Sequence, residues 1–273
     1  MGLKHLLVHL DSTDRAPQRV TLAVKLATRF GARLTGLFAE SASIGPSIVA
    51  RRSPQHIERA MEEARAGFEA AAGQAGLATD WWQLEAGEYA QVVGWTVVCC
   101  RYVDLAIFGQ HDPDHVSTLP HDLIEQVLLN SGRPVLVVPY VGTYTDVGER
   151  VLVAWTGSRE AARAVNDALP FMKRAREVDV IALQHATGGT HSVPVPPVDI
   201  AVHLRAHGIE ARYERIIVDE LGAVDNVLNR AAESAADLTV LGGYGHYGFP
   251  YFQRSSTTRD ILRTMTTPVL LSR

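Results

Sequence analysis

The sequence has only two cysteines among its 273 residues, and the two are adjacent, Cys99 and Cys100. Neighbouring cysteines rarely bond to each other because the ring is strained, and two cysteines cannot make a disulfide framework. Both lie in the apolar run VVGWTVVCC. We therefore expect them to pack in a helix or a core, with a redox or metal role as the alternative.

Long apolar runs are also missing. No uncharged apolar stretch approaches the roughly 20 residues that are needed to span a bilayer. The first residues, MGLKHLLVHLDS, hold one lysine and a short apolar stretch that ends at Asp11. This pattern favours a first strand over a signal peptide, and it predicts a cytoplasmic protein without membrane contact.

The chain has no excess of basic residues, since its formal net charge is −4. Nucleic-acid binders usually carry a basic face, so we expect no nucleic-acid partner. Hydrophobic residues make up 47% and charged residues 21% of the sequence. This balance is typical of a globular protein, and the length allows two domains of ordinary size.

What the sequence does contain is an internal duplication. Three segments of the first half return in the same order in the second: HLLVHLDST (5–13) as RVLVAWTGS (150–158), DLAIFGQ (104–110) as DLTVLGG (237–243), and SGRPVLVVP (131–139) as MTTPVLLSR (265–273). The stretch between the halves is polar and contains glycine, which is typical of a linker. We expect two domains, 1–141 and 149–273.

Each half alternates short β-branched runs with longer amphipathic stretches, which is typical of βαβ units around a parallel sheet. The predicted strands are 5–10, 33–39, 80–84, 103–108, 134–138, 150–155, 177–183, 209–217, 237–242 and 268–272. The predicted helices are 15–30, 54–75, 88–100, 120–131, 159–172, 197–207, 223–235 and 257–265. In the second helix Ser53 should be the N-cap, Pro54 the first residue and Gly76 the C-cap.

Because crossovers between parallel strands are right-handed, this order predicts an α/β protein of two tandem doubly wound (Rossmann-like) domains. Each domain should be a five-stranded parallel sheet with helices on both faces. In such sheets ligands bind beyond the carboxyl ends of the strands, where the strand order reverses. The loops that follow strands are therefore the places to look for function.

One such loop in the second half has the composition of a phosphate site. The strand at 237–242 runs into Gly242-Gly243-Tyr244-Gly245, and Ser255-Ser256-Thr257-Thr258 precedes and opens the last helix. Glycines let phosphates approach backbone N–H groups, and hydroxyls at a helix N-terminus form an anion site. The pattern predicts a phosphate cradle.

The spacing resembles the nucleotide motif of the universal stress protein family, Gly-x2-Gly-x9-Gly-[Ser/Thr] after the fourth strand, with an Asp closing the first strand. Here Gly242-x2-Gly245-x9-Ser255-Ser256 keeps the spacing, with Ser255 in the place of the third glycine. The resemblance covers both halves, so the chain is similar to a tandem universal stress protein. It implies a stress-response protein that binds an adenine nucleotide in its second domain, with ATP as the first candidate. Such a protein would act by regulation and not by catalysis. Whether magnesium accompanies the nucleotide is left open.

The resemblance also implies the binding residues. Glycines and hydroxyls would hold the phosphates, while the strand ends would face the ribose and base. Thr156 stands where the family has its first-strand Asp, and the aromatics of 246–251 would either stack on a base or fill the pocket. The candidate residues are Thr156, Gly157, Ser158, Leu183, Gln184, Gly242, Gly245, His246, Ser255, Ser256 and Thr257. No catalytic and no metal-binding residues are predicted.

The first half keeps Asp11 but has Asp112 where the second glycine should be, with Asp114 nearby and Asp122 in the place of Ser256. Carboxylates repel phosphates, so we interpret this half as degenerate in ligand binding. Asp11 should be a polar contact or a helix N-cap. Residues 111–115 and His121 could ligate a metal, but zinc needs three or four converging ligands, and a solvated loop is favoured. The same holds for the histidines at 185 and 191.

Two other functions are compatible with this sequence. The protein could be a nucleotide-free scaffold whose halves pair through their final strands into a pseudo-dimer that pairs again as a homodimer. It could also bind a small apolar ligand among Tyr247, Phe249, Tyr251 and Phe252. An adenine-nucleotide hydrolase is least favoured, because no nucleophile, base and oxyanion donor come together in the sequence. Trp81 and Trp82 should be core or interface aromatics.

Overall fold

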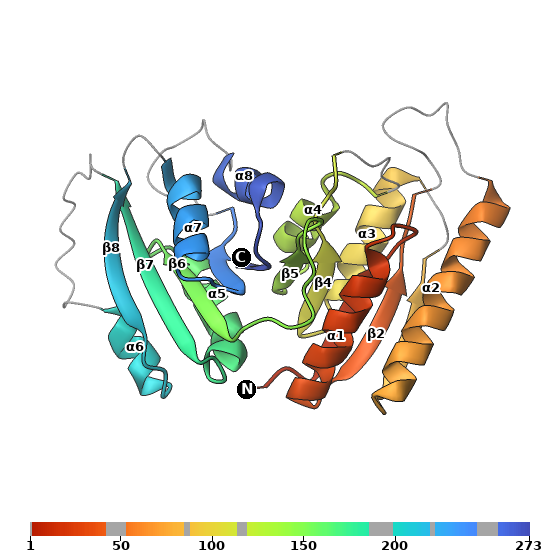
Figure 1. Cartoon of the computed structure of the whole chain (residues 1–273). Coiled ribbons are helices and arrows are strands. Elements are labelled where there is room, and N and C mark those ends of the chain that lie inside the picture. Colours follow the sequence, from red (N-terminus) through yellow and green to blue (C-terminus); the bar gives the residue numbers. More distant parts are fainter. Residues whose placement is uncertain are drawn as a thin grey trace. The chain divides into compact units, whose positions relative to one another are not determined.

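The structure is a computed structural model, and it describes residues 2–41, 53–84, 88–113, 119–185, 199–218, 222–244 and 256–273. The chain divides into two compact units, Met1–Asp146 and Val147–Arg273 (Figure 1). We call them unit 1 and unit 2. Among the helices in the described ranges, none is both long enough and apolar enough to cross a membrane.

Unit 1 is a five-stranded parallel sheet with the order β3-β2-β1-β4-β5. Its strands are β1 (His5–Leu10), β2 (Arg33–Phe38), β3 (Thr79–Gln83), β4 (Leu105–Gly109) and β5 (Val135–Val138). Its helices are α1 (Ala16–Phe30), α2 (Pro54–Gln74), α3 (Tyr89–Cys100) and α4 (Leu123–Asn130). Helix α1 packs beside α2, and α3 packs beside α4 (Figure 1).

Unit 2 repeats this topology with the order β10-β9-β6-β7-β8, again with parallel neighbours. Its strands are β6 (Arg150–Trp155), β7 (Glu177–His185), β8 (Arg212–Val218), β9 (Leu238–Gly242) and β10 (Val269–Ser272). Its helices are α5 (Arg159–Met172), α6 (Ile200–Ala206), α7 (Gly222–Glu233) and α8 (Ser256–Thr264). The predicted fold class is confirmed in both halves.

The chain reverses direction across each sheet, and this puts helices on both faces. In unit 1 it steps from β1 to β2 to β3 toward one edge, and then returns across the sheet to β4 and β5. Right-handed crossovers therefore place α1 and α2 on one face and α3 and α4 on the other. Central strands covered on both faces are mostly apolar, as in β1, where Leu6, Leu7, Val8 and Leu10 are buried.

The repeated Asp-Leu at the entry to β4 and β9 has a structural reason. The Asp237 carboxylate accepts hydrogen bonds from the backbone N–H of Gly148, Glu149 and Arg150 at 2.9, 3.0 and 2.9 Å. In unit 1, Asp104 accepts from the N–H of Lys4 and His5 at 2.7 and 3.0 Å. Each aspartate thus fixes the start of the first strand of its own unit.

Several local predictions are confirmed. Ser53 caps α2, its Oγ accepting from the His56 N–H at 3.3 Å, and Pro54 opens the helix. The predicted C-cap is wrong by one residue, because Ala75 is the C-cap and Gly76 follows it with φ +63°. Helix α4 begins at Leu123, three residues later than predicted, because the Leu123 N–H bonds to Pro120 O in a turn.

The cysteines and tryptophans of unit 1 pack as the sequence suggests. Cys100 is fully buried and Cys99 is half-buried, and both thiols are free. Burial raises the pKa of both thiols, which makes them poor nucleophiles. Trp81 and Trp82 are half-buried on β3, where Trp81 lies 5.9 Å from the Phe68 ring of α2.

Candidate functional site

In unit 2 three strand ends lie side by side where the strand order reverses. Strand β6 leads to its neighbour β7 on one side, while β9 leads to β10 on the other. The register pairs Trp155 with Ala182 of β7, and Ala154 with Leu241 of β9. The loops after β6 and β9 and the end of β7 therefore meet at one edge, which is where doubly wound sheets bind ligands. We call this edge the unit 2 crevice.

The loop after β6 turns directly into α5. Gly157 has φ +73°, and the Ser158 Oγ accepts a hydrogen bond from the Ala161 N–H at 3.1 Å, so Ser158 is the N-cap. The Thr156 hydroxyl donates to the Ser158 Oγ at 3.1 Å. Thr156 and Gly157 are exposed at the crevice, whereas the Ser158 hydroxyl is already used by the helix.

Gly242 lies beneath the first turn of α5. A Cβ at this position would stand 2.5 Å from the Ala161 backbone nitrogen and 2.9 Å from the Glu160 Cβ. Such distances are impossible for a real side chain, so only glycine lets the helix approach β9 this closely. The sequence assigned Gly242 to phosphate, and the structure adds a packing reason for a glycine at this position.

The glycine-rich strand end and the hydroxyl-rich helix start come together. The Tyr244 N–H donates to the Thr258 Oγ1 at 3.0 Å, across 14 residues of sequence. Tyr244 has φ +55° and is buried, as is Thr258. The sequence placed Thr258 in the hydroxyl cluster of the phosphate cradle but not among the candidate binding residues.

The other predicted residues are placed as follows. Leu183 is half-buried on β7, next to the end of β6, and Thr257 is exposed in the first turn of α8. Gln184 lies on β7 and Ser256 opens α8, but both side chains are outside the described part. Gly245, His246 and Ser255 are outside the described residues, as are the aromatics Tyr247, Phe249, Tyr251 and Phe252.

Glu160 is a buried carboxylate beside the crevice that sequence reasoning missed. It is only 3% exposed, and its Oε1 accepts from the Arg159 Nε at 2.6 Å. Burial acts to raise the pKa of Glu160, but hydrogen bonds from Arg159, the backbone and Ser158 outweigh it and hold that pKa below its ordinary value. The ionised Glu160 thus places a negative charge at the N-terminus of α5, where it complements the helix dipole.

In unit 1 the corresponding strand end is occupied by the protein's own charges. Asp11 follows β1, and its Oδ2 lies 2.5 Å from the Arg19 Nη2, while its Oδ1 accepts from the Thr13 N–H at 2.9 Å. Asp11 is therefore a polar contact, as one of the two expectations had it. The N-cap expectation is wrong, because Arg15 occupies the N-cap of α1 and no side chain caps that helix.

A hollow of about 220 Å³ lies over this ion pair and is lined by Asp11, Thr13, Asp14, Arg15, Arg19, Gly109, Gln110, His111, Asp112, Leu119 and Tyr140.

At the start of α4, the Tyr89 hydroxyl donates to the Asp122 carboxylate and lies 3.3 Å from the His121 Nδ1. Burial and the neighbouring Asp122 raise the pKa of Tyr89 to about 12. A carboxylate and a phenol thus stand where unit 2 has hydroxyls.

No three His, Cys, Asp or Glu side chains in the described ranges gather closely enough to hold a metal ion. Asp114 and His115 of the histidine- and aspartate-rich loop are outside those ranges, as are His191 and the side chain of His185.

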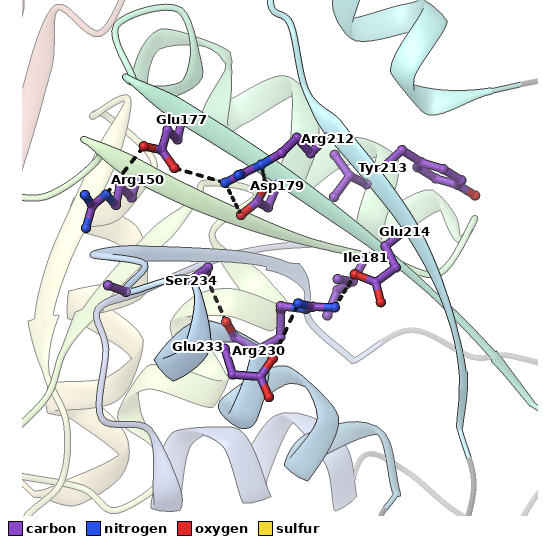
Figure 2. A pocket seen from close by; sticks show the side chains of 12 residues that line it. Arg150, Glu177, Asp179, Ile181, Arg212, Tyr213, Glu214, Arg230, Glu233 and Ser234 are labelled. Carbon is purple, nitrogen blue, oxygen red and sulfur yellow. Dashed lines mark hydrogen bonds and ion pairs between the residues drawn. The ribbon is translucent and has the colours of Figure 1, made fainter.

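A hollow of about 520 Å³ in unit 2 lies at the amino ends of β6, β7 and β8 (Figure 2). Arg212 bonds to Asp179 at 2.6 Å and to Glu177 at 2.9 Å. Figure 2 shows Arg230 of α7 between Glu214 and Glu233, with which it forms ion pairs. The three arginines of this hollow form ion pairs with its four carboxylates. The hollow lies at the opposite ends of the strands from the unit 2 crevice.

Comparison with known proteins gives a family and a fold. The model of the universal stress protein family matches residues 148–273. No protein of curated function matches the chain.

Among solved structures, a universal stress protein from Archaeoglobus fulgidus DSM 4304 is similar over 98% of this chain and 96% of its own, at 17% identity and a TM-score of 0.72. A functionally unknown protein from Pseudomonas aeruginosa PAO1 is similar over 99% and 92%, at 15% identity and a TM-score of 0.61. Both likenesses concern the fold, and they extend it to unit 1.

Proposed function

We propose, because residues 148–273 belong to the universal stress protein family, that unit 2 binds an adenine nucleotide at its crevice. ATP is the first candidate. In this proposal occupancy of the site regulates partner proteins, and the nucleotide is a ligand, not a substrate. A cytoplasmic location and the pairing of the two halves, or of two chains, stay predictions from the sequence.

The observation that carries this proposal is the hydrogen bond from the Tyr244 N–H to the Thr258 Oγ1 at 3.0 Å. It joins the loop after β9 to the first turn of α8, so a ligand could meet backbone N–H groups and helix hydroxyls together. Those groups and the helix dipole favour a phosphate. The exposed Thr156 and Gly157 stand at the same edge, where a ribose or base can reach them.

In this arrangement Gly242 and Gly245 would keep the phosphate path free of side chains. The hydroxyls at 255–257 would donate to phosphate oxygens, while Leu183 and Gln184 would offer backbone groups to the base. A magnesium ion would reduce the repulsion between the phosphates and the buried Glu160 carboxylate. His246 and the aromatics after it would lie over the base.

The test begins with natively purified protein, which is denatured so that any released small molecule can be identified by mass spectrometry. Titration calorimetry with ATP and AMP follows. We expect an adenine nucleotide to be released or bound, and Gly245→Asp to abolish binding, because that change copies Asp112 of unit 1 and repels phosphate. The matched control is Asp112→Gly in unit 1, which should leave binding unchanged. No binding of ATP or AMP at millimolar concentration would overturn the proposal.

One observation favours the scaffold as a second candidate. Helix α5 packs on Gly242 with no room for a Cβ, and the Glu160 carboxylate already occupies the first turn of that helix. If these groups close the unit 2 crevice, unit 2 acts through its surface alone. The same experiment separates the candidates, since a scaffold releases no nucleotide and shows no thermal shift with ATP.

A further inference from the structure

The strand-end pocket of unit 1 holds a buried guanidinium, whereas none of the arginines in the described part of unit 2 is buried. Arg19 of α1 is 3% exposed, although arginine is rarely buried without a partner. Its Nη2 donates to the Asp11 Oδ2 at 2.5 Å and its Nε to the His9 carbonyl oxygen at 3.2 Å. In unit 2 the residue after the first strand is Thr156, which is neutral and exposed.

The guanidinium lies over the end of β4 as well as β1. A Cβ at Gly109 would stand 2.5 Å from the Arg19 Nη1 and 3.1 Å from its Cζ. Strands β1 and β4 are neighbours, and the strand order of unit 1 reverses between them. Arg19 therefore occupies the place in unit 1 where a ligand of a doubly wound sheet would sit.

The charges around Arg19 require a cation there. Asp11 and Glu40 are both buried, at 3% and 1% exposed. Glu40 accepts from the N–H and the hydroxyl of Ser12, each at 2.6 Å, in the loop that also carries Asp11. Without the guanidinium, the Asp11 carboxylate would be buried with no cation beside it, which costs far more than the pair itself contributes.

We propose that the unit 1 pocket is a guanidinium-binding site whose resident ligand is the chain's own Arg19. The bound side chain closes this half to nucleotide from within, and a free guanidinium compound binds in its place once the side chain is shortened. A planar fork that bonds to Asp11 and to a backbone carbonyl at once suits guanidinium better than ammonium. This inference concerns unit 1, and it holds whether or not unit 2 binds nucleotide.

The test uses the full chain with Arg19→Ala, followed by hydrogen exchange and mass spectrometry of peptides from β1 and α1. We expect the temperature at which these peptides lose protection to fall by about 10 °C or more, because a buried carboxylate loses its partner. Millimolar methylguanidinium should restore part of the loss with a saturable dose dependence. Tetramethylammonium at equal ionic strength should restore none of the lost protection. Methylguanidinium should restore little protection in the Arg19→Lys variant.

The matched control is Arg15→Ala, which removes an exposed arginine from the N-cap of the same helix and from the lining of the same pocket. It should neither destabilise β1 nor respond to methylguanidinium. Equal responses of the two variants, or equal rescue by both cations, would overturn the proposal. If Arg19→Ala does not fold, the proposal is tested by NMR of the wild-type chain with isotope-labelled arginine. It should show one slowly exchanging guanidinium that disappears in Arg19→Lys, and its absence would also overturn the inference.

Discussion

His9 is a fully buried histidine on β1, stacked on the Phe108 ring at 5.1 Å. Its Nε2 lies 2.9 Å from the Ala39 carbonyl oxygen, which can only accept, so Nε2 carries the proton. Among the described residues no hydrogen-bond donor faces Nδ1, which lies 3.7 Å from the Asp11 Oδ2. Burial lowers the pKa of His9, outweighing the neighbouring Asp11 carboxylate. The fold therefore holds His9 in its neutral form.

This predicts that unit 1 loses stability in mild acid. Because the folded-state pKa of His9 is lowered, the unfolded chain binds the proton more readily, and the free energy of unfolding falls as pH drops below about 6.5. Asp11 acts in the same direction at lower pH. Burial opposes its ionisation, but Arg19 and Thr13 hold the pKa of Asp11 below its ordinary value. Urea unfolding between about pH 7.5 and 5.5 should show the effect, and His9→Gln should have a flatter slope. Equal slopes would contradict this account.

At the scale of elements, the contact between α5 and β9 depends on one missing side chain. The helix begins at an N-cap serine and lays its first turn on Gly242, so helix and strand meet through backbone atoms. The glycines of α2 differ, because a Cβ built at Gly67 or Gly73 meets nothing within 4 Å. Glycine identity alone does not distinguish these positions, and only the packing around each one does.

We predict that Gly242→Ala destabilises unit 2 by about 1–3 kcal/mol or more, since backbone must move to admit the methyl group. The control Gly73→Ala should stabilise α2 by about 0.5–1 kcal/mol, because alanine has a higher helix propensity than glycine and makes the unfolded chain less flexible. Chemical denaturation of the two variants measures both effects. If Gly242→Ala were as stable as wild type, the close approach of α5 to β9 would be wrong.

At the scale of the whole molecule, the two units share their fold but differ in the residues at their strand ends. Both units keep the strand order, the Asp that fixes the first strand, and a glycine at the end of the fourth strand. They differ at the strand ends, where unit 1 buries Asp11 with Arg19 and unit 2 exposes Thr156. One unit is thus filled by its own side chain, and the other has the strand ends at which we propose a ligand binds.

The preserved aspartates allow a comparison of the two units in one chain. Asp104→Ala and Asp237→Ala should each destabilise their own unit by about 1–3 kcal/mol, because backbone N–H groups at the start of the first strand lose a charged acceptor. Asp237→Ala should destabilise its unit more than Asp104→Ala does, because Asp237 accepts from three backbone N–H groups and Asp104 from two. Hydrogen exchange of peptides from β1 and β6 reports each unit separately. A larger loss at β1 than at β6 would contradict the comparison.

The sequence by itself determined the duplication, the order of strands and helices, and the fold class, because hydrophobic periodicity and caps are local signals. It also located the loops after β6 and β9, since parallel strands bring their carboxyl ends to one edge. Only the tertiary structure decided that Arg19 is buried on Asp11, that Gly242 admits α5, and that Glu160 is a buried carboxylate. An arginine or glutamate in a helix looks solvated in sequence, and its burial depends on which distant strand end its helix covers.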